Sequence, residues 1–187
     1  RILRVAEPSP LPAGRGGTLA PDVLVTRYSD MPHNVEAMHV APDGAIILMT
    51  KEGRGSRAAG LRPTLLYRIA PPDWTQASRT APPARAGLVD SLPIYPRSAA
   101  GRMVTDAALA GDARLLAVRT YRELYVFAAD SATALPRHDR TPVVCDLAPL
   151  DEEQGEGVGF VAWQGTVGRF ALTSEGRGEP LRLVDCP

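Results

Sequence analysis

Short apolar runs alternate with turn-forming residues along most of this chain. In "VEAMHVAPDGAIILMT" (35–50), two apolar runs flank the Pro-Asp-Gly segment at 42–44. Proline presets the φ angle of a turn and glycine adopts a positive φ without steric cost, so this segment predicts a tight turn between two β-strands. A third strand, "LLYRIA" (65–70), ends at the proline pair 71–72, because proline cannot continue a strand ladder.

The same plan recurs further along the chain. "VTDAALAGDARLLAVRT" (104–120) repeats the first hairpin with "GDA" in place of "PDG", and "LYVFAAD" (124–130) supplies its third strand. A weaker copy follows in "GEGVGFVAWQGTVGRFALTSEG" (155–176), with "PLRLVDC" (180–186) as its closing strand. Between the first two copies, the Pro/Ala/Arg-rich segment 71–87 predicts a long loop.

A repeating unit of about 40–50 residues with three or four antiparallel strands is typical of a β-propeller blade. We therefore expect an all-β fold with little or no helix, built as an incomplete β-propeller-like stack of four-stranded antiparallel blades. The blades are predicted at 35–93, 103–149 and 155–187, with a partial blade within 1–30. This is fewer than the roughly four to eight blades of a closed propeller, so the prediction leaves sheet edges open.

The composition fits one globular domain rather than several. The 187 residues are 44% hydrophobic and 22% charged, and 21 basic residues balance 21 acidic ones. A net charge of zero argues against broad nucleic-acid binding and against a polybasic membrane-surface patch. No apolar run approaches the ~20 residues that span a bilayer. The abrupt beginning "RILRVAEP" indicates a processed or truncated N-terminus.

Two stretches resemble a known family. "RYSDMPHNVEAMHVAPDGAIILMTKEG" (27–53) and "VTDAALAGDARLLAVRTYRELYVF" (104–127) are similar to a family of bacterial, usually exported, β-propeller-like repeat proteins. A blade-starting acidic residue, a Pro-Asp-Gly turn and an Arg-Thr-Tyr segment recur in that family, and the resemblance covers roughly 28–172. The second copy here lacks the proline and glycine of the turn at the equivalent positions. The resemblance implies a periplasmic or extracellular location.

Three acidic residues stand at the predicted starts of the inner strands: Glu36, Asp106 and Glu156. In a propeller these positions crowd around the central axis, where three carboxylates could bind a cation such as Ca²⁺ or position a water molecule. The favoured interpretation is that each carboxylate accepts backbone N–H groups of the neighbouring blade. Carboxylates brought together without a cation would repel one another.

Aromatic and arginine side chains provide the candidates for protein contacts. Arg119, Tyr121, Arg122 and Tyr125 form the densest such cluster, either on an exposed face or packed between blades. Trp74 lies in the long predicted loop, where it either docks a partner or folds back onto its own domain.

The two cysteines, Cys145 and Cys186, have no CxxC spacing, which excludes a zinc ribbon and the usual redox motif. They form either a disulfide or two buried thiols, and a disulfide would imply an oxidising compartment. His33 and His39 flank Glu36, but six residues of strand separate them by about 20 Å. No nucleophile elbow or phosphate loop is present in the sequence.

These observations favour a non-enzymatic accessory subunit, without cofactor or nucleic acid, on the extracytoplasmic side of a membrane-bound protein assembly. Its open sheet edges would be covered by other protein subunits. Such a short β-rich subunit is similar to an extra component on the periplasmic side of some bacterial photosynthetic reaction-centre and light-harvesting complexes. The alternative is an exported phosphoesterase-like hydrolase or ligand-binding module, with Glu36, Asp106 and Glu156 at the axial mouth, and Ca²⁺ as its cofactor.

Overall fold

The computed structural model describes residues 1–6, 17–51, 63–94 and 100–187. The chain is all-β, as the sequence predicts: 51% of it is strand, and the described residues contain no α-helix. Two short 3-10 turns, η1 (Ala100–Arg102) and η2 (Ala148–Leu150), precede the second and third large sheets.

The first large sheet, sheet 1, has the strand order β3-β7-β6-β5-β4. Its four main strands form an antiparallel meander, and β3 adds to the outer edge in parallel with β7. The bounds are β3 (Thr26–Tyr28), β4 (Val35–Val40), β5 (Ile46–Thr50), β6 (Thr64–Ile69) and β7 (Ala84–Leu92). The sequence predicts a loop over 71–87, but strand β7 begins at Ala84. The predicted loop therefore extends too far, because residues 84–87 belong to the strand.

Sheets 2 and 3 follow sheet 1 along the chain, and a small two-stranded arm precedes it at the N-terminus. Sheet 2 is a four-stranded meander, sheet 3 has three strands, and β1 pairs with β2 in the arm. Sheet 2 contains β8 (Val104–Leu109), β9 (Leu115–Thr120), β10 (Glu123–Ala128) and β11 (Val143–Asp146). Sheet 3 contains β12 (Gly155–Gln164), β13 (Val167–Ser174) and β14 (Arg182–Cys186), and the arm contains β1 (Ile2–Arg4) and β2 (Asp22–Leu24).

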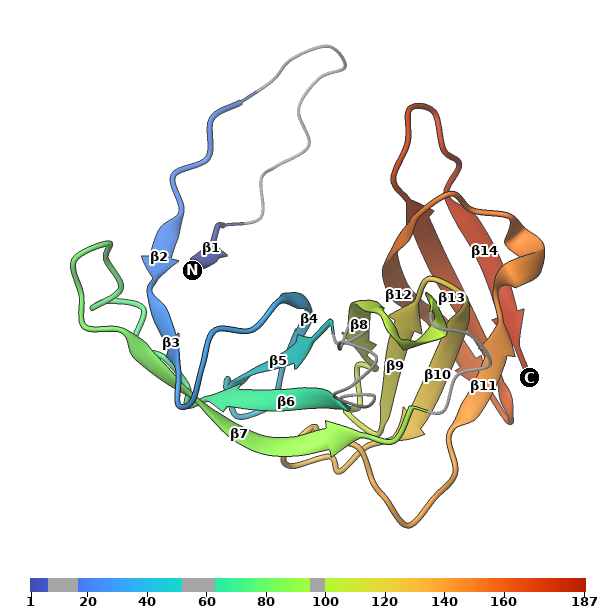
Figure 1. Cartoon of the computed structure of the whole chain (residues 1–187), viewed down its shortest axis with the longest axis horizontal. Helices are drawn as coiled ribbons and strands as arrows, with labels where there is room; N and C mark the ends of the chain where they lie inside the picture. The colour runs from blue at the N-terminus through green and yellow to red at the C-terminus, as the bar shows by residue number, and fades with distance from the viewer. Residues whose placement is uncertain (7–16, 52–62, 95–99) are drawn as a thin grey trace, which may run out of the picture.

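One edge strand of each large sheet, β4, β8 or β12, lies toward the centre of the molecule. Strand β8 contacts both β4 and β12, and the remaining strands of each sheet run outward from this junction (Figure 1). The strands of the three sheets occupy 26–92, 104–146 and 155–186, with sheet 2 between the other two.

Strict alternation of side chains produces the two internal interfaces. On β9, Leu116 and Val118 belong to the core shared with sheet 1, whereas Ala117 belongs to the core shared with sheet 3. On β5, Ile47 packs toward sheet 2 and Ile46 packs on the opposite face, against the arm and β3. Sheet 2 is therefore covered on both faces, which explains the nearly continuous apolar sequence of its central strands.

The first hairpin turn has the predicted chemistry. Gly44 has a φ of +86° and its N–H donates to the carbonyl of Ala41, while the Asp43 carboxylate accepts the N–H of Ala45. In the second copy, Ala113 takes over the left-handed position with a φ of +57°. This conformation is uncommon for a residue with a Cβ, and Ala113 is held there by burial and by a bond from its N–H to the Ala110 carbonyl.

Cys145 and Cys186 form a disulfide with a Cα–Cα distance of 5.8 Å. Cys145 lies on β11 and Cys186 on β14, so the bond joins the outermost strands of sheets 2 and 3. It is continuous with the apolar core between these sheets.

We predict that replacing both cysteines with alanine lowers the free energy of unfolding by about 4 kcal/mol, because the bond closes a loop with a sequence separation of 41 residues. Urea denaturation of the oxidised protein and of the double variant measures the difference. Reduction of the unmodified protein should give the same midpoint as the double variant. An unchanged midpoint on reduction would contradict the prediction.

Candidate functional site

The inner ends of the three sheets carry the predicted acidic residues. Strands β4, β8 and β12 each have a register shift near their start, between Val35 and Ala37, Val104 and Asp106, and Gly155 and Gly157. Glu36 and Glu156 both lie at the shift, whereas Asp106 lies one residue beyond it and Thr105 takes the equivalent place. The prediction that all three carboxylates stand at equivalent positions is therefore wrong for sheet 2, where the acidic residue comes one position later in the strand.

Asp106 links sheet 2 to sheet 3. Its carboxylate accepts the backbone N–H of Val158 on β12 at 2.8 Å. Burial raises the pKa of Asp106, and the hydrogen bonds from the Val158 and Ala107 N–H groups partly oppose that rise. This arrangement is the inter-sheet contact that the favoured interpretation assigns to the carboxylates.

Glu36 and Glu156 lie on either side of Lys51, the single lysine of the sequence. The Lys51 ammonium donates to the Tyr121 hydroxyl at 2.7 Å and lies 3.8 Å from a Glu36 carboxylate oxygen. The Tyr121 hydroxyl lies 3.4 Å from a Glu156 oxygen, which also accepts the Gln154 amide at 2.6 Å. The group joins residues of all three sheets or their turns.

Lys51 supplies a positive charge beside Glu36, where the alternative interpretation expects a metal ion. Burial lowers the pKa of Lys51, but its hydrogen bond with Tyr121 and the nearby Glu36 carboxylate outweigh burial, so the pKa is raised. The ammonium is therefore charged at neutral pH. Among the described residues, no group of three or more His, Cys, Asp or Glu side chains could hold a metal ion.

Arg119 forms the second polar link between sheets 2 and 3. Its side chain projects from β9 and is 0% exposed. One terminal nitrogen donates to the carbonyls of Gly157 and Thr173, at 2.7 and 2.8 Å, and the other is paired with the Glu152 carboxylate. Glu152 is also nearly fully buried, and its other oxygen lies 3.5 Å from Arg182 Nε.

Gly155 makes room for this guanidinium. A Cβ at this position would overlap the Arg119 side chain, so any larger residue would displace it. Burial lowers the pKa of Arg119, and the Glu152 carboxylate counteracts this effect. A guanidinium remains protonated in proteins, so the pair is ionic.

The other predicted contact residues divide between surface and core. Tyr125 is buried between sheets 1 and 2, where its hydroxyl donates to Glu123, and Arg119 is buried as described. Neither is available to a partner protein, and for these two the packing alternative holds. Tyr121 is half-buried and Arg122 is exposed. Trp74 packs against sheet 1 with the Arg4 guanidinium 4.6 Å above its ring, so it folds back onto its own domain.

Two histidine contacts connect sheet 1 with the segment between β10 and β11. His39 is buried and its Nε2 lies 3.0 Å from the Ala134 carbonyl oxygen; burial lowers its pKa, so the neutral ring donates this bond. His138 lies 2.9 Å from the Asp90 carboxylate on β7.

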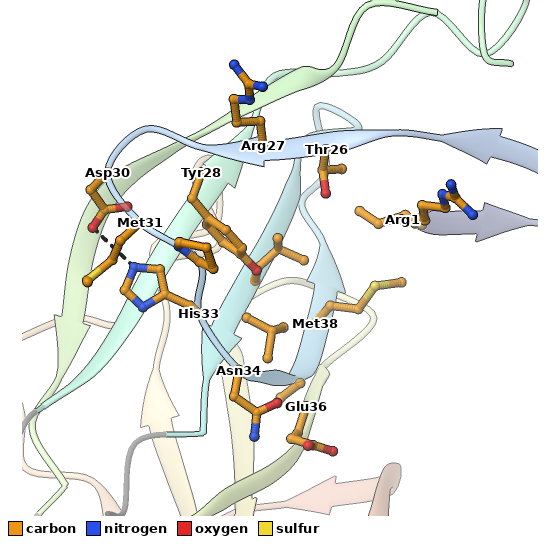
Figure 2. A pocket seen from close by; sticks show the side chains of 15 residues that line it. Arg1, Thr26, Arg27, Tyr28, Asp30, Met31, His33, Asn34, Glu36 and Met38 are labelled. Atoms are coloured by element: carbon orange, nitrogen blue, oxygen red, sulfur yellow. Dashed lines mark hydrogen bonds and ion pairs between the residues drawn. The ribbon is translucent and has the colours of Figure 1, made fainter. Parts of the chain in front are cut away.

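A cleft of about 890 Å³ lies beside β3 and β4 (Figure 2). Three of its lining residues, Tyr28, Val35 and Leu48, belong to the apolar cluster on the face of sheet 1 opposite sheet 2. Tyr28, Asp30, His33 and Glu36 line the cleft, with Tyr67 behind them. The buried Tyr67 hydroxyl lies 2.7 Å from both an Asp30 oxygen and His33 Nε2. The Tyr67 hydrogen bond lowers the pKa of Asp30 to about 2. Sequence reasoning missed this cluster, although "RYSDMPH" places three of its members within six residues.

Comparison with protein-family models, with characterised proteins and with solved structures finds no match to this chain. The described residues include no helix that is long and apolar enough to cross a membrane.

We predict that replacing Arg119 with methionine lowers the free energy of unfolding by about 3–5 kcal/mol, because Glu152 is left buried without its main partner. Adding Glu152→Leu to Arg119→Met should recover part of that loss, since removing both members of a buried ion pair is less costly than removing one. Chemical denaturation of the unmodified protein, the two single variants and the double variant gives the four unfolding free energies of a double-mutant cycle. Strictly additive losses would contradict this account of the pair.

Proposed function

We propose that this chain is a non-enzymatic structural subunit of an extracytoplasmic protein assembly. Its sheets form a propeller-like stack, and a sheet of another protein subunit covers the outer face of sheet 3. The observation that carries the proposal is the exposed outer face of sheet 3. Sheets 1, 2 and 3 already pack face to face in series, and this outer face is where the series would continue.

The outer face of sheet 3 follows from its register. Phe170 and Leu172 on β13 are fully buried against sheet 2, so Ala171 between them points to the other side. Ala171 pairs with Gly159 on one neighbouring strand and with Leu183 on the other. These three residues form a flat apolar strip, on which the Leu183 side chain is 63% exposed.

Small residues on this strip favour a sheet as the occupant. Gly159 carries no side chain, and a Cβ placed there would meet no other atom within 4 Å, so another backbone can approach closely. Further exposed aliphatic side chains lie on the same sheet or beside it: Val161, Val167 and Leu181, at 53%, 42% and 65% exposure. One ion pair, Arg169 with Asp185, lies beside the strip, two residues along β13 and β14, and offers a partner a polar contact.

The disulfide and Arg119 support the proposal because they hold sheet 3 firmly against sheet 2. A rigid face loses little conformational freedom when a partner binds. The disulfide also supports an oxidising location such as the periplasm or the extracellular space. A photosynthetic reaction-centre complex is one assembly of this kind, and it remains a prediction of the sequence.

Catalysis at the axial carboxylates receives less support. The Asp106 carboxylate accepts the backbone N–H of Val158. Lys51 and Tyr121 lie between Glu36 and Glu156. These partners satisfy the groups that the hydrolase alternative requires to hold Ca²⁺ or activate water.

The test uses the tagged full chain purified from the cells that naturally produce it. We predict a stoichiometric protein partner that slows hydrogen exchange in β12–β14, and Leu183→Glu should weaken its binding roughly tenfold or more. Leu88→Glu on β7 is the matched control, since Leu88 is similarly exposed at 53% but lies in sheet 1.

Equal loss of the partner in both variants, or protection confined to sheet 1, would contradict the proposed face. Assembly of the chain only with copies of itself through β14 would contradict the proposed occupant.

A further inference from the structure

We propose that the cleft beside β3 and β4 is a binding site for an organic cation that carries an apolar body. This site lies on sheet 1, distant in the chain from the proposed docking face on sheet 3, and nothing in the proposed structural role requires it. The argument rests on the kinds of side chain that the cleft presents and on their fixed arrangement.

Aromatic and thioether groups form the walls of the cleft. The Tyr28 ring extends from β3 toward β4, and Met31 and Met38 lie on either side of it (Figure 2). The two methionines are 53% and 43% exposed, so their thioethers are available to a ligand. Aromatic faces attract cations through the ring quadrupole, and methionine adapts its shape to apolar groups.

Two acidic residues, Asp30 and Glu36, and two basic residues, Arg1 and Arg27, line the cleft, and the Arg1 guanidinium is directed away from the Tyr28 ring (Figure 2). Alternation along β3 places Thr26 and Tyr28 toward the cleft, while the Arg27 guanidinium points away from it (Figure 2). The Glu36 carboxylate lines the cleft from β4 and is 36% exposed, and the Lys51 ammonium, which also donates to Tyr121, lies 3.8 Å from it. Asp30 lies at the other end of the cleft and remains ionised at neutral pH.

The aromatic wall is held in place before any ligand arrives. Tyr28 makes edge contacts with His33 and Tyr67, at centroid distances of 5.1 and 4.9 Å. Tyr67 is fully buried, and its hydroxyl is hydrogen-bonded to Asp30. A wall fixed in this way costs little entropy to order on binding, which favours a specific site over a passive groove.

The chemistry selects a cation over an anion or a neutral polar ligand. An anion would face two carboxylates, and a neutral polar ligand would gain nothing from the ring and the thioethers. A quaternary ammonium or a guanidinium attached to an apolar group satisfies both the acidic ends and the aromatic wall. Such a group could belong to a small molecule or to an arginine side chain of a peptide.

The experiment titrates the isotope-labelled full chain with three probes while backbone amide signals are recorded by NMR. Benzyltrimethylammonium represents the small-molecule source, acetyl-Gly-Arg-Gly-amide the peptide source, and N-benzylacetamide is the neutral control. We expect the ammonium to shift the signals of Tyr28, Met31 and Met38, and the neutral probe to bind roughly tenfold more weakly. The stronger of the two cationic probes identifies the source.

Two variants localise the effect. Tyr28→Leu removes the ring, and Glu36→Gln removes the charge with little change in shape; each should weaken cation binding several-fold. Glu175→Gln, which removes a carboxylate from an exposed turn of sheet 3, should leave the affinity unchanged. The dispersed spectrum of each variant verifies that it is folded.

Equal binding of the neutral probe, shifts confined to other regions, or unchanged affinity in Glu36→Gln and Tyr28→Leu would overturn the proposal. Failure here leaves the docking face on sheet 3 unaffected, because that face is tested by a separate variant on β14, Leu183→Glu.

Discussion

A buried guanidinium is the constraint on which the second half of this structure depends. Arg119 has no exposed surface, and it contacts carbonyls that lie 38 and 54 residues further along the chain. An unpaired charge in this position would be very costly, so Glu152 must be buried with it. Gly155 must also lack a side chain. Sheet 3 therefore has one position relative to sheet 2, and the disulfide holds the outer strands in the same arrangement.

The acidic residues at the sheet junction are likewise bound by partners within the chain. They do not form a cluster that could hold a metal ion in the described structure. Asp106 accepts a backbone N–H of sheet 3, and the single lysine lies between Glu36 and Glu156. These contacts determine how the three sheets meet. Two surfaces remain exposed to solvent: the apolar strip on sheet 3 and the cleft with its aromatic wall on sheet 1. The proposed functions rest on these two surfaces.

Local patterns were sufficient to predict many of the strands and the first turn, but not the start of β7. The alternation in 35–50 and the Pro-Asp-Gly segment specify a hairpin through backbone preferences that act over a few residues. The one-residue shift at Asp106 and the burial of Arg119 were not predictable, because both depend on register and on contacts between distant segments. A local sequence of arginine and tyrosine residues looks the same whether the side chains lie on the surface or between two sheets, so it does not predict which arginine is buried. The Asp30, His33 and Tyr67 cluster was missed because Tyr67 comes from a strand 34 residues away.

Native-state hydrogen exchange tests most directly whether sheets 2 and 3 form one unit. If Arg119 and the disulfide join them as described, the buried amides of β13 and β9 should open with the same free energy and the same denaturant dependence. An opening of β12–β14 at much lower free energy, while β8–β11 stays protected, would contradict the account.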